Sequence, residues 1–336
     1  MRRDCPVGSW EINNLPGNGW DRDLISRAYD SASSFGCISC VVIHRGKIIA
    51  QLGDLSRKVL IRSIRKSFLS ALIGIEVGRR RIRLGDTLRD LKIDDVEELS
   101  DSEREASVSD LLKARSGVYH PALAETPEMT AAKPPRGSNA PGSHWLYNNW
   151  DFNALGSIYE KATGQSVFEG LYSDIALPIG MEDFTSSDGS YLTGEQSWHP
   201  AYHMHMTSRD LARFGFLFLN RGRWNDKQIV PEEWVSESVR AHSFDGSNGY
   251  GYMWWTTGHD GEAQTGTVSR YRKNMPPFRY FAHGAYGQMI AVMPGRELVI
   301  AHLAETKQRS AAENLEIWEF VRLILEAQPR SNSALG

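Results

Sequence analysis

The sequence predicts an α+β fold with one antiparallel sheet of about five strands, flanked by the two terminal helices, and a mostly helical inserted region. Three observations support this prediction. Strand-like segments occur near the start of the chain, at 37–53, and again near its end, at 279–303. Amphipathic segments with helical spacing lie outside both of them, at 21–34 and 313–327. Between the strand-rich segments, the chain changes to short helices separated by polar loops.

These patterns divide the chain into two regions. We expect 1–78 and 249–336 to form the sheet region and 79–248 to form the helical insertion, with a cleft between them. The chain has 336 residues, 41% of them hydrophobic and 24% charged, which is enough to bury a large core. No stretch approaches the run of about 18 apolar residues that a membrane helix requires.

Charge and the first residues bear on partners and location. The formal net charge of −3 argues against nucleic acid or an anionic membrane as the main partner. The chain begins MRRDCPVGSW, and no apolar signal-peptide core follows these residues. We therefore expect a cytoplasmic protein that acts on a small molecule.

Two groups of residues have spacings that occur in metal sites, but other features of the sequence argue against metal binding by either group. Cys37 and Cys40 have C-x-x-C spacing, but they fall on a predicted strand, where residues three apart point to opposite faces. No second C-x-x-C completes a tetrahedral site. His199, His203 and His205 are close in sequence, but Pro200 argues against a clean helix that would align them. We expect buried structural cysteines, no metal and no organic cofactor.

The elements follow from hydrophobic spacing bounded by turn residues. After the helix at 21–34, two strands flank the short turn at Arg45-Gly46, and a buried helix then runs from Ser63 to about Gly78. The remaining predictions are helices at 107–112, 149–164, 167–175, 208–219 and 231–239, strands at 249–256, 279–282, 288–293 and 297–303, and the helix at 313–327.

Ser63-Ile64-Arg65-Lys66 places a serine and a lysine three residues apart at the start of the buried helix. Residues at this spacing share a helix face, so the two side chains can meet. A serine hydroxyl is a weak nucleophile until a base removes its proton, and a desolvated lysine can be that base. S-x-x-K also occurs where a serine caps a helix and the lysine is solvated, so the motif alone does not decide.

Two further motifs lie later in the chain. Tyr147-Asn148-Asn149 precedes the helix at 149–164, so Tyr147 and Asn149 can project into one cleft. His283-Gly284-Ala285 lies at the edge of the predicted sheet, where a glycine lets the backbone approach a ligand closely.

In this order, the three motifs resemble those of the serine β-lactamase and penicillin-binding-protein superfamily, which are S-x-x-K, then S-D-N or Y-x-N, then K-T-G. The Y-x-N form is similar to the class C β-lactamase branch and its esterase, amidase and nylon-oligomer-hydrolase relatives. Ser107-Val108-Ser109-Asp110-Leu111-Leu112 with Ser116-Gly117 also resembles a helix of that family. The resemblance covers about 20–328 and implies a β-lactamase-like fold.

The resemblance implies roles at the matching positions. Ser63 matches the acylated nucleophile, Lys66 the lysine beside it, and Tyr147 the tyrosine that shares acid and base work with the lysine. Asn149 matches the asparagine that bonds a substrate amide or the lysine. Backbone N–H groups of Ser63 and of the sheet edge just after Gly284 would hold the oxyanion.

The third motif departs from the family pattern, because His283 and Ala285 replace lysine and threonine around Gly284. A histidine that is mostly neutral near pH 7 holds a substrate carboxylate less well than lysine. We therefore expect an esterase or amidase more than an enzyme that acts on β-lactams or D-amino-acid peptides.

Aromatic and basic residues near the motifs complete the expected site. Large aromatic residues are more often core, although any of five tryptophans could line an apolar pocket: Trp145, Trp150, Trp198, Trp254 and Trp255. We expect only Trp145 and Trp150, which flank Tyr147, to contact substrate and the other three to be core. Arg62 and Arg65 flank Ser63. We expect both to face solvent, although either would favour a substrate that carries a carboxylate.

The sequence thus predicts a serine hydrolase that cleaves a small ester or amide through an acyl-enzyme on Ser63. The same acyl-enzyme passing its acyl group to an amine or alcohol would make an acyltransferase. A peptidase or weak β-lactamase is a further enzymatic alternative. A catalytically silent binding scaffold is the non-enzymatic one.

Overall fold

The computed structural model describes residues 5–6, 8, 10, 19–244, 248–257, 279–305 and 311–329. Parts of the predicted sheet region, including 258–278 and 330–336, lie outside the described residues. The helices, including short 3-10 and π turns marked η, are α1 (Arg22–Ser34), η1 (Arg62–Ile64), α2 (Arg65–Gly78), η2 (Glu103–Glu105), α3 (Val108–Leu112), α4 (Pro127–Ala131), α5 (Asn149–Thr163), α6 (Val167–Leu171), η3 (Tyr172–Ala176), η4 (Ser186–Asp188), α7 (Ser208–Leu219), α8 (Glu232–Ser238), η5 (Pro294–Arg296) and α10 (Ala311–Ala327).

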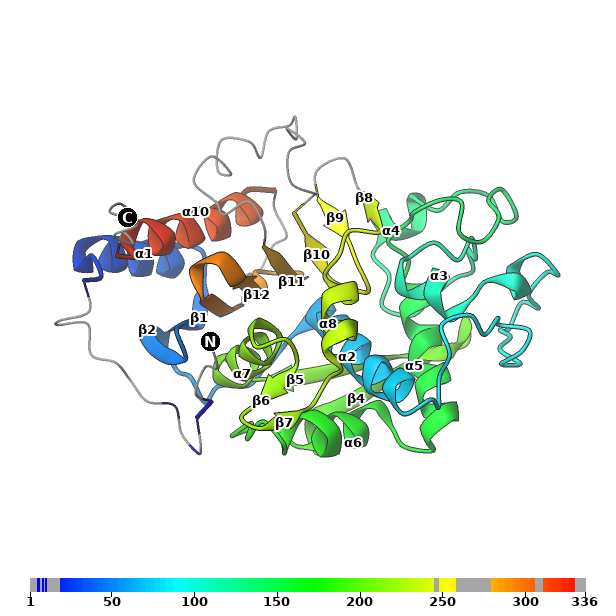
Figure 1. Cartoon of the computed structure of the whole chain (residues 1–336). Helices are drawn as coiled ribbons and strands as arrows, with labels where there is room; N and C mark the ends of the chain where they lie inside the picture. Colours follow the sequence, from blue (N-terminus) through cyan, green and yellow to red (C-terminus); the bar gives the residue numbers. More distant parts are fainter. Residues whose placement is uncertain are drawn as a thin grey trace, which may run out of the picture.

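The main sheet is antiparallel and is built from both ends of the chain, as predicted (Figure 1). Within the described residues, its strands are, in spatial order, β2 (Lys47–Gly53), β1 (Cys37–His44), β13 (Leu298–Ala304), β12 (Gln288–Met293), β11 (Tyr280–Gly284), β10 (Trp255–Thr256), β9 (Gly249–Tyr250) and β8 (Ser243–Phe244). This sheet has eight strands there, so the prediction of about five was too low. The predicted strand at 249–256 is divided into two short strands, β9 and β10, and β8 has only two residues, too few for a hydrophobic pattern to reveal.

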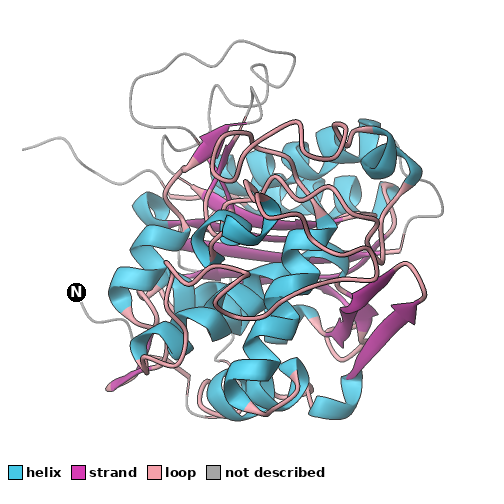
Figure 2. Cartoon of the chain, turned by 90° about the vertical axis from the view of Figure 1, so that its right-hand side faces the viewer, coloured by secondary structure: helices cyan, strands magenta, loops and turns pink. Residues whose placement is uncertain are grey.

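Both faces of the central strands are buried. On β1, Cys40 and Val42 pack on the α1 and α10 side, whereas Val41 and Ile43 join the core on the opposite side, which α7 covers. Figure 2 shows helices on both sides of the main sheet. A strand buried on both faces reads as a continuous apolar run, which is why these strands were predictable.

The region between the two halves of the main sheet contains a second, smaller sheet that the sequence analysis missed. Its strands are, in spatial order, β3 (Val59–Leu60), β5 (Ser197–Met206) and β4 (Gly189–Gly194), and a separate pair joins β6 (Arg223–Trp224) to β7 (Lys227–Gln228). No strand was predicted within 79–248, which was expected to be mostly helical. The alternation of polar and apolar residues in β5 is typical of a strand, but Pro200, a residue rare inside strands, weakened that signal.

Local sequence signals explain the helices that were predicted correctly. Asp21 caps α1, Ser107 forms a capping box with Asp110 at α3, and Gly164 ends α5 in the left-handed conformation. No helix among the described residues is long and apolar enough to cross a bilayer. Cys37 and Cys40 lie on β1 as free thiols.

Candidate active site

The backbone just before Ser63 is held between two strands. The Ile61 N–H donates to the Met204 carbonyl of β5 at 3.0 Å. On the other side, a Cβ built at Gly284 of β11 would lie 2.6 Å from the Ile61 oxygen, so only glycine fits there. Arg62, the residue between Ile61 and Ser63, adopts a positive φ of 53°, which is a costly conformation for a non-glycine residue. The tertiary contacts thus position Ser63 at the start of the buried helix.

Ser63, Lys66 and Tyr147 meet as a compact group. Lys66 Nζ lies 3.1 Å from Ser63 Oγ and 2.6 Å from the Tyr147 hydroxyl oxygen. Ser63 lies in η1, the turn before α2, Lys66 is the second residue of α2, and Tyr147 comes from the loop before α5. Lys66 Nζ is therefore within hydrogen-bonding distance of a candidate nucleophile, the Ser63 hydroxyl, and of a second group that can carry a proton, the Tyr147 hydroxyl.

The surroundings of Lys66 favour its neutral form. Only 2% of its surface is exposed, and Nζ lies over the rings of Tyr147 and Phe152. Burial lowers the pKa of Lys66 well below its usual value, and the positive charge of neighbouring Arg65 lowers it further. A lysine held neutral in this way can accept a proton from Ser63.

These side chains open into a cavity of about 560 Å³. Its walls come from both predicted regions of the chain, the sheet region and the helical insertion. The lining residues are Arg62, Ser63, Arg65, Lys66, Ala124, Glu125, Thr126, Met129, Tyr147, Asn149, Leu192, His203, Trp255, His283, Ala285 and Tyr286. A volume of this size fits a small organic molecule.

Asn149 lines this cavity and has a free acceptor. Its Nδ2 donates to the Ala124 carbonyl at 2.6 Å, which fixes the orientation of the amide. Its Oδ1 is buried and accepts no hydrogen bond from any residue that the structure describes. The neighbouring Asn148 is instead structural, because it caps α5 and bonds Val118 and Asp151. Asn149 is therefore placed to accept a hydrogen bond from a ligand N–H.

The structure places the two expected tryptophans elsewhere. Trp150 is fully buried, and its indole N–H donates to Asp95 at 2.6 Å, so it does not line the cavity. Trp145 does not line it either, but packs behind the wall against Trp255. Helical geometry explains the position of Trp150, since consecutive residues of α5 point about 100° apart and Asn149 is the one that faces the cavity. Trp255, which was predicted to be core, lines the cavity and stacks on Tyr147.

Of the third motif, His283 and Ala285 line the cavity, whereas Gly284 does not. Gly284 acts through its backbone, by allowing β11 to approach the segment before Ser63.

Sequence reasoning missed several residues of the wall. Arg65 was expected to face solvent, but it is 3% exposed and lines the cavity, whereas Arg62 is exposed as predicted. His203 lines the cavity from β5, a strand that was not predicted. Burial lowers the pKa of His203 to about 4, together with the charges of Arg65 and Arg62. No signal in the sequence could have shown that these residues converge.

Metal ligation finds little support in this cavity. Across the ranges that the structure describes, no group of three or more His, Cys, Asp or Glu side chains is arranged to hold a metal ion. His199, His203 and His205 are spread along β5, and His199 Nδ1 lies 2.9 Å from Ser157 Oγ.

Comparisons with known proteins bear on the family and the fold of the chain. The model of a protein family described as Beta-lactamase matches residues 26–323. A putative 6-aminohexanoate-dimer hydrolase from Bacillus anthracis has a similar structure, with 20% identity and a TM-score of 0.69 over 98% of this chain and 91% of that one. A hydrolase with promiscuous acyltransferase activity, EstCE1, has 13% identity and a TM-score of 0.64 over 90% and 98% of the two chains.

A curated relative adds little about activity. An uncharacterised protein of Alkalihalophilus pseudofirmus is 27% identical over 106 residues, which are 27% of this chain and 32% of the relative. The match thus spans about a third of that relative's length.

Proposed function

The chain belongs to the beta-lactamase family, whose members are serine hydrolases acting on esters and amides, and we propose that it cleaves a small ester or amide through an acyl-enzyme on Ser63. One observation carries the proposal: Lys66 Nζ lies within hydrogen-bonding distance of both Ser63 Oγ and the Tyr147 hydroxyl. A nucleophile, a base and a second proton carrier in mutual contact are what acyl transfer requires.

The first half of the reaction acylates Ser63. Neutral Lys66 accepts the Ser63 proton while Oγ attacks the substrate carbonyl carbon. Backbone N–H groups of Ser63 and of the sheet edge after Gly284 stabilise the resulting oxyanion. As the tetrahedral intermediate collapses, Tyr147 donates a proton to the leaving alcohol or amine, and Lys66 restores that proton to Tyr147.

The second half releases the acyl group. A water molecule gives a proton to Tyr147 or Lys66 and attacks the acyl carbon, and Ser63 Oγ leaves with a proton. The carboxylic acid then dissociates. Asn149 would accept a hydrogen bond from the amide N–H of a substrate, since its Oδ1 has no protein partner.

A second candidate is acyl transfer to an alcohol or amine in place of water. The structural likeness to a hydrolase with promiscuous acyltransferase activity favours keeping it. Adding a primary alcohol to the assay separates the two, because transfer produces a new ester at the expense of the acid.

Intact-mass spectrometry tests the proposal directly. We expect a fluorophosphonate and a p-nitrophenyl ester to add one adduct each to the wild type and none to Ser63→Ala. Ser67→Ala is the matched control, because this serine lies one turn further along α2, is buried and donates to the Met253 carbonyl. It should still be labelled.

Other labelling patterns have distinct meanings. A stable penicilloyl adduct on Ser63 would move the protein toward the penicillin-binding alternative. If no reagent labels the folded wild type, the mechanism is wrong and the scaffold alternative replaces it.

A further inference from the structure

The side chain of Arg65 is a buried cation in the wall of the active-site cavity. It is 3% exposed and lies in contact with the cavity that holds Ser63. Its guanidinium carbon lies 4.4 Å from the centre of the Tyr202 ring. Its Nη1 is buried and has no hydrogen-bond partner in the described part of the chain. Among the described residues, no carboxylate forms an ion pair with it, which is unusual for an arginine this deeply buried.

Tyr202 is a hydrogen-bonding neighbour of Arg65, but none of the described residues that face Arg65 supplies a free negative charge. Lys66 and Arg62 are basic, and His203 is close enough for Arg65 to lower its pKa. The acid of the cavity wall, Glu125, is already paired with Lys133 at 2.5 Å. Taking a charge out of water without a counter-ion is costly, so this arrangement persists only if the surrounding fold holds it in place. A ligand carboxylate would supply the missing partner.

We propose that Arg65 binds a carboxylate of the substrate, so that the enzyme prefers esters or amides that carry a carboxylate near the scissile bond. The inference deepens the proposed function of Ser63 and rests on it. A guanidinium presents several N–H donors in a plane and matches a carboxylate well. His203 lines the same cavity from β5.

Arg65 differs in its exposure to solvent from Arg62, the arginine on the other side of Ser63 in the sequence. Arg62 is exposed and lies 4.9 Å from the centre of the Tyr286 ring, where water solvates its charge. Both arginines line the cavity, but only the buried one lacks solvent as an alternative partner. This difference makes Arg62 a matched control.

Two pairs of substrates test the proposal. In the first pair, p-nitrophenyl hydrogen adipate carries a carboxylate on the acyl side, and methyl p-nitrophenyl adipate is its neutral counterpart. In the second, p-acetoxybenzoate carries the carboxylate on the leaving group, and methyl p-acetoxybenzoate is neutral. The measured quantity is the ratio of kcat/KM for the anionic member to that for the neutral member. A common effect on Lys66 cancels in this ratio.

We expect the wild type to prefer the anionic member of at least one pair. Arg65→Gln should lower this preference at least about tenfold, mainly through KM, because a charge-assisted hydrogen bond is lost. Arg65→Lys should retain part of it, and Arg62→Gln should keep it within about threefold. Thermal unfolding of each variant checks that the fold is intact.

The outcomes separate this inference from the proposed function. If the wild type hydrolyses both members equally, or if Arg62→Gln and not Arg65→Gln removes the preference, the Arg65 site is wrong while the hydrolase stands. If the wild type hydrolyses no ester, calorimetry with adipate on Ser63→Ala decides. Binding that Arg65→Gln abolishes supports the carboxylate site without the hydrolase, and absence of binding overturns both.

Discussion

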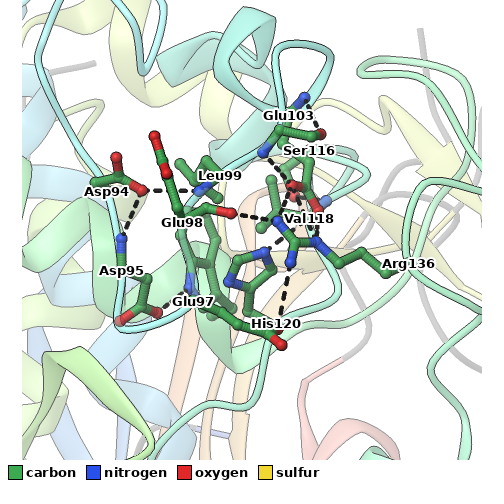
Figure 3. Close-up of polar contacts among 12 residues, drawn as sticks. Asp94, Asp95, Glu97, Glu98, Leu99, Glu103, Ser116, Val118, His120 and Arg136 are labelled. Atoms are coloured by element: carbon green, nitrogen blue, oxygen red, sulfur yellow. Dashed lines mark hydrogen bonds and ion pairs between the residues drawn. The ribbon is translucent and has the colours of Figure 1, made fainter.

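Two buried charged clusters of this protein differ in how their charges are compensated. At the active-site cavity, Lys66 and Arg65 are almost fully buried and have no acidic partner among the described residues. In the helical insertion, Glu103 is also buried, at 2% exposure, but it is surrounded by donors. Figure 3 shows this second cluster, in which the Arg136 guanidinium meets the Glu103 carboxylate beside His120.

The contacts of Glu103 account for its stability as an anion. Arg136 Nη2 donates to Oε2 at 2.8 Å, and the Ser100 N–H donates to the same oxygen at 2.8 Å. His120 Nε2 lies 3.3 Å from Oε1. Burial alone would raise the pKa of Glu103, but the bonds from Arg136 and Ser100 and the proximity of His120 lower it to about 2.

The comparison distinguishes two uses of a buried charge. A charge whose partners all come from the protein ties loops together and adds to stability. A charge without such partners costs stability and is available to a substrate or a proton. The first kind belongs to the fold of this protein, and the second kind belongs to its chemistry.

The largest expected effect is that of Lys66→Met. Removing the base should lower kcat/KM for a p-nitrophenyl ester at least about 10³-fold. The free energy of unfolding should stay the same or rise, because the buried amine costs more in the folded than in the unfolded protein. Ester hydrolysis and urea unfolding measure the two quantities. A large decrease in the free energy of unfolding would show instead that Lys66 stabilises the fold, as Glu103 does.

Glu103→Gln should have the opposite signature. We expect a loss of about 2 kcal/mol in the free energy of unfolding, because the charge-assisted hydrogen bonds from Arg136 and Ser100 weaken, although Arg136 keeps its ion pair with Glu97. Labelling of Ser63 by a fluorophosphonate should persist below the unfolding temperature. Glu98→Gln is the control, since its side chain is 79% exposed and its ion pair with Arg104 should add little stability.

Acid should separate the two clusters. Lys66 must be neutral to act, so activity should fall as the pH drops through its lowered pKa. The folded-state pKa of Glu103 is lowered, so its stabilising contribution is complete above about pH 4.5 and disappears as the pH falls toward about 2. Activity and folding should therefore respond to acid with separate midpoints, because different groups control them. Parallel pH profiles of kcat/KM and of circular dichroism check this separation.

Arg65→Gln should shift the pH profile by a smaller amount. Without the neighbouring positive charge, the pKa of Lys66 rises, so the acid limb of kcat/KM for a neutral ester should move to higher pH. The rate at the high-pH plateau should recover to within about threefold of the wild type. An unchanged acid limb would mean that Arg65 does not act on Lys66.

The smallest effect is expected from an exposed ion pair. Arg83, whose side chain is 80% exposed, bonds Asp86 at 2.9 Å. Arg83→Gln should change the free energy of unfolding by less than about 0.5 kcal/mol, and it should leave ester hydrolysis unchanged. Urea unfolding with a kinetic assay provides the baseline for the other variants. A larger decrease in the free energy of unfolding would show that losing an ion pair destabilises this protein even where the charges are exposed.

Much of the fold was predictable because its signals are local or periodic. The apolar runs of β1, β12 and β13, the capping residues of α1 and α3, and the glycine that ends α5 are all readable in the chain. The predicted strand at 249–256 contains β9 and β10. The two-residue β8 was too short to recognise, and Pro200 weakened the strand signal of β5, although β5 forms a local hairpin with β4.

The candidate site divides in the same way. Ser63 and Lys66 are near in sequence, and motif order connected them with Tyr147, so these three residues could be proposed without coordinates. The burial of Arg65, the contribution of His203, and the positions of Trp150 and Trp255 could not. Each depends on which way a side chain points once α2, α5 and β5 have packed together.

By itself, the amino-acid sequence determined the family resemblance, the main helices and central strands, and the three residues that we propose for catalysis. Those features depend on residue type and spacing along the chain. Only the tertiary structure decided which cationic side chains are buried and which of these are paired with an acidic residue. The physical reason is that burial and pairing depend on distances between segments that may be more than a hundred residues apart in the chain, as Arg65 and His203 are.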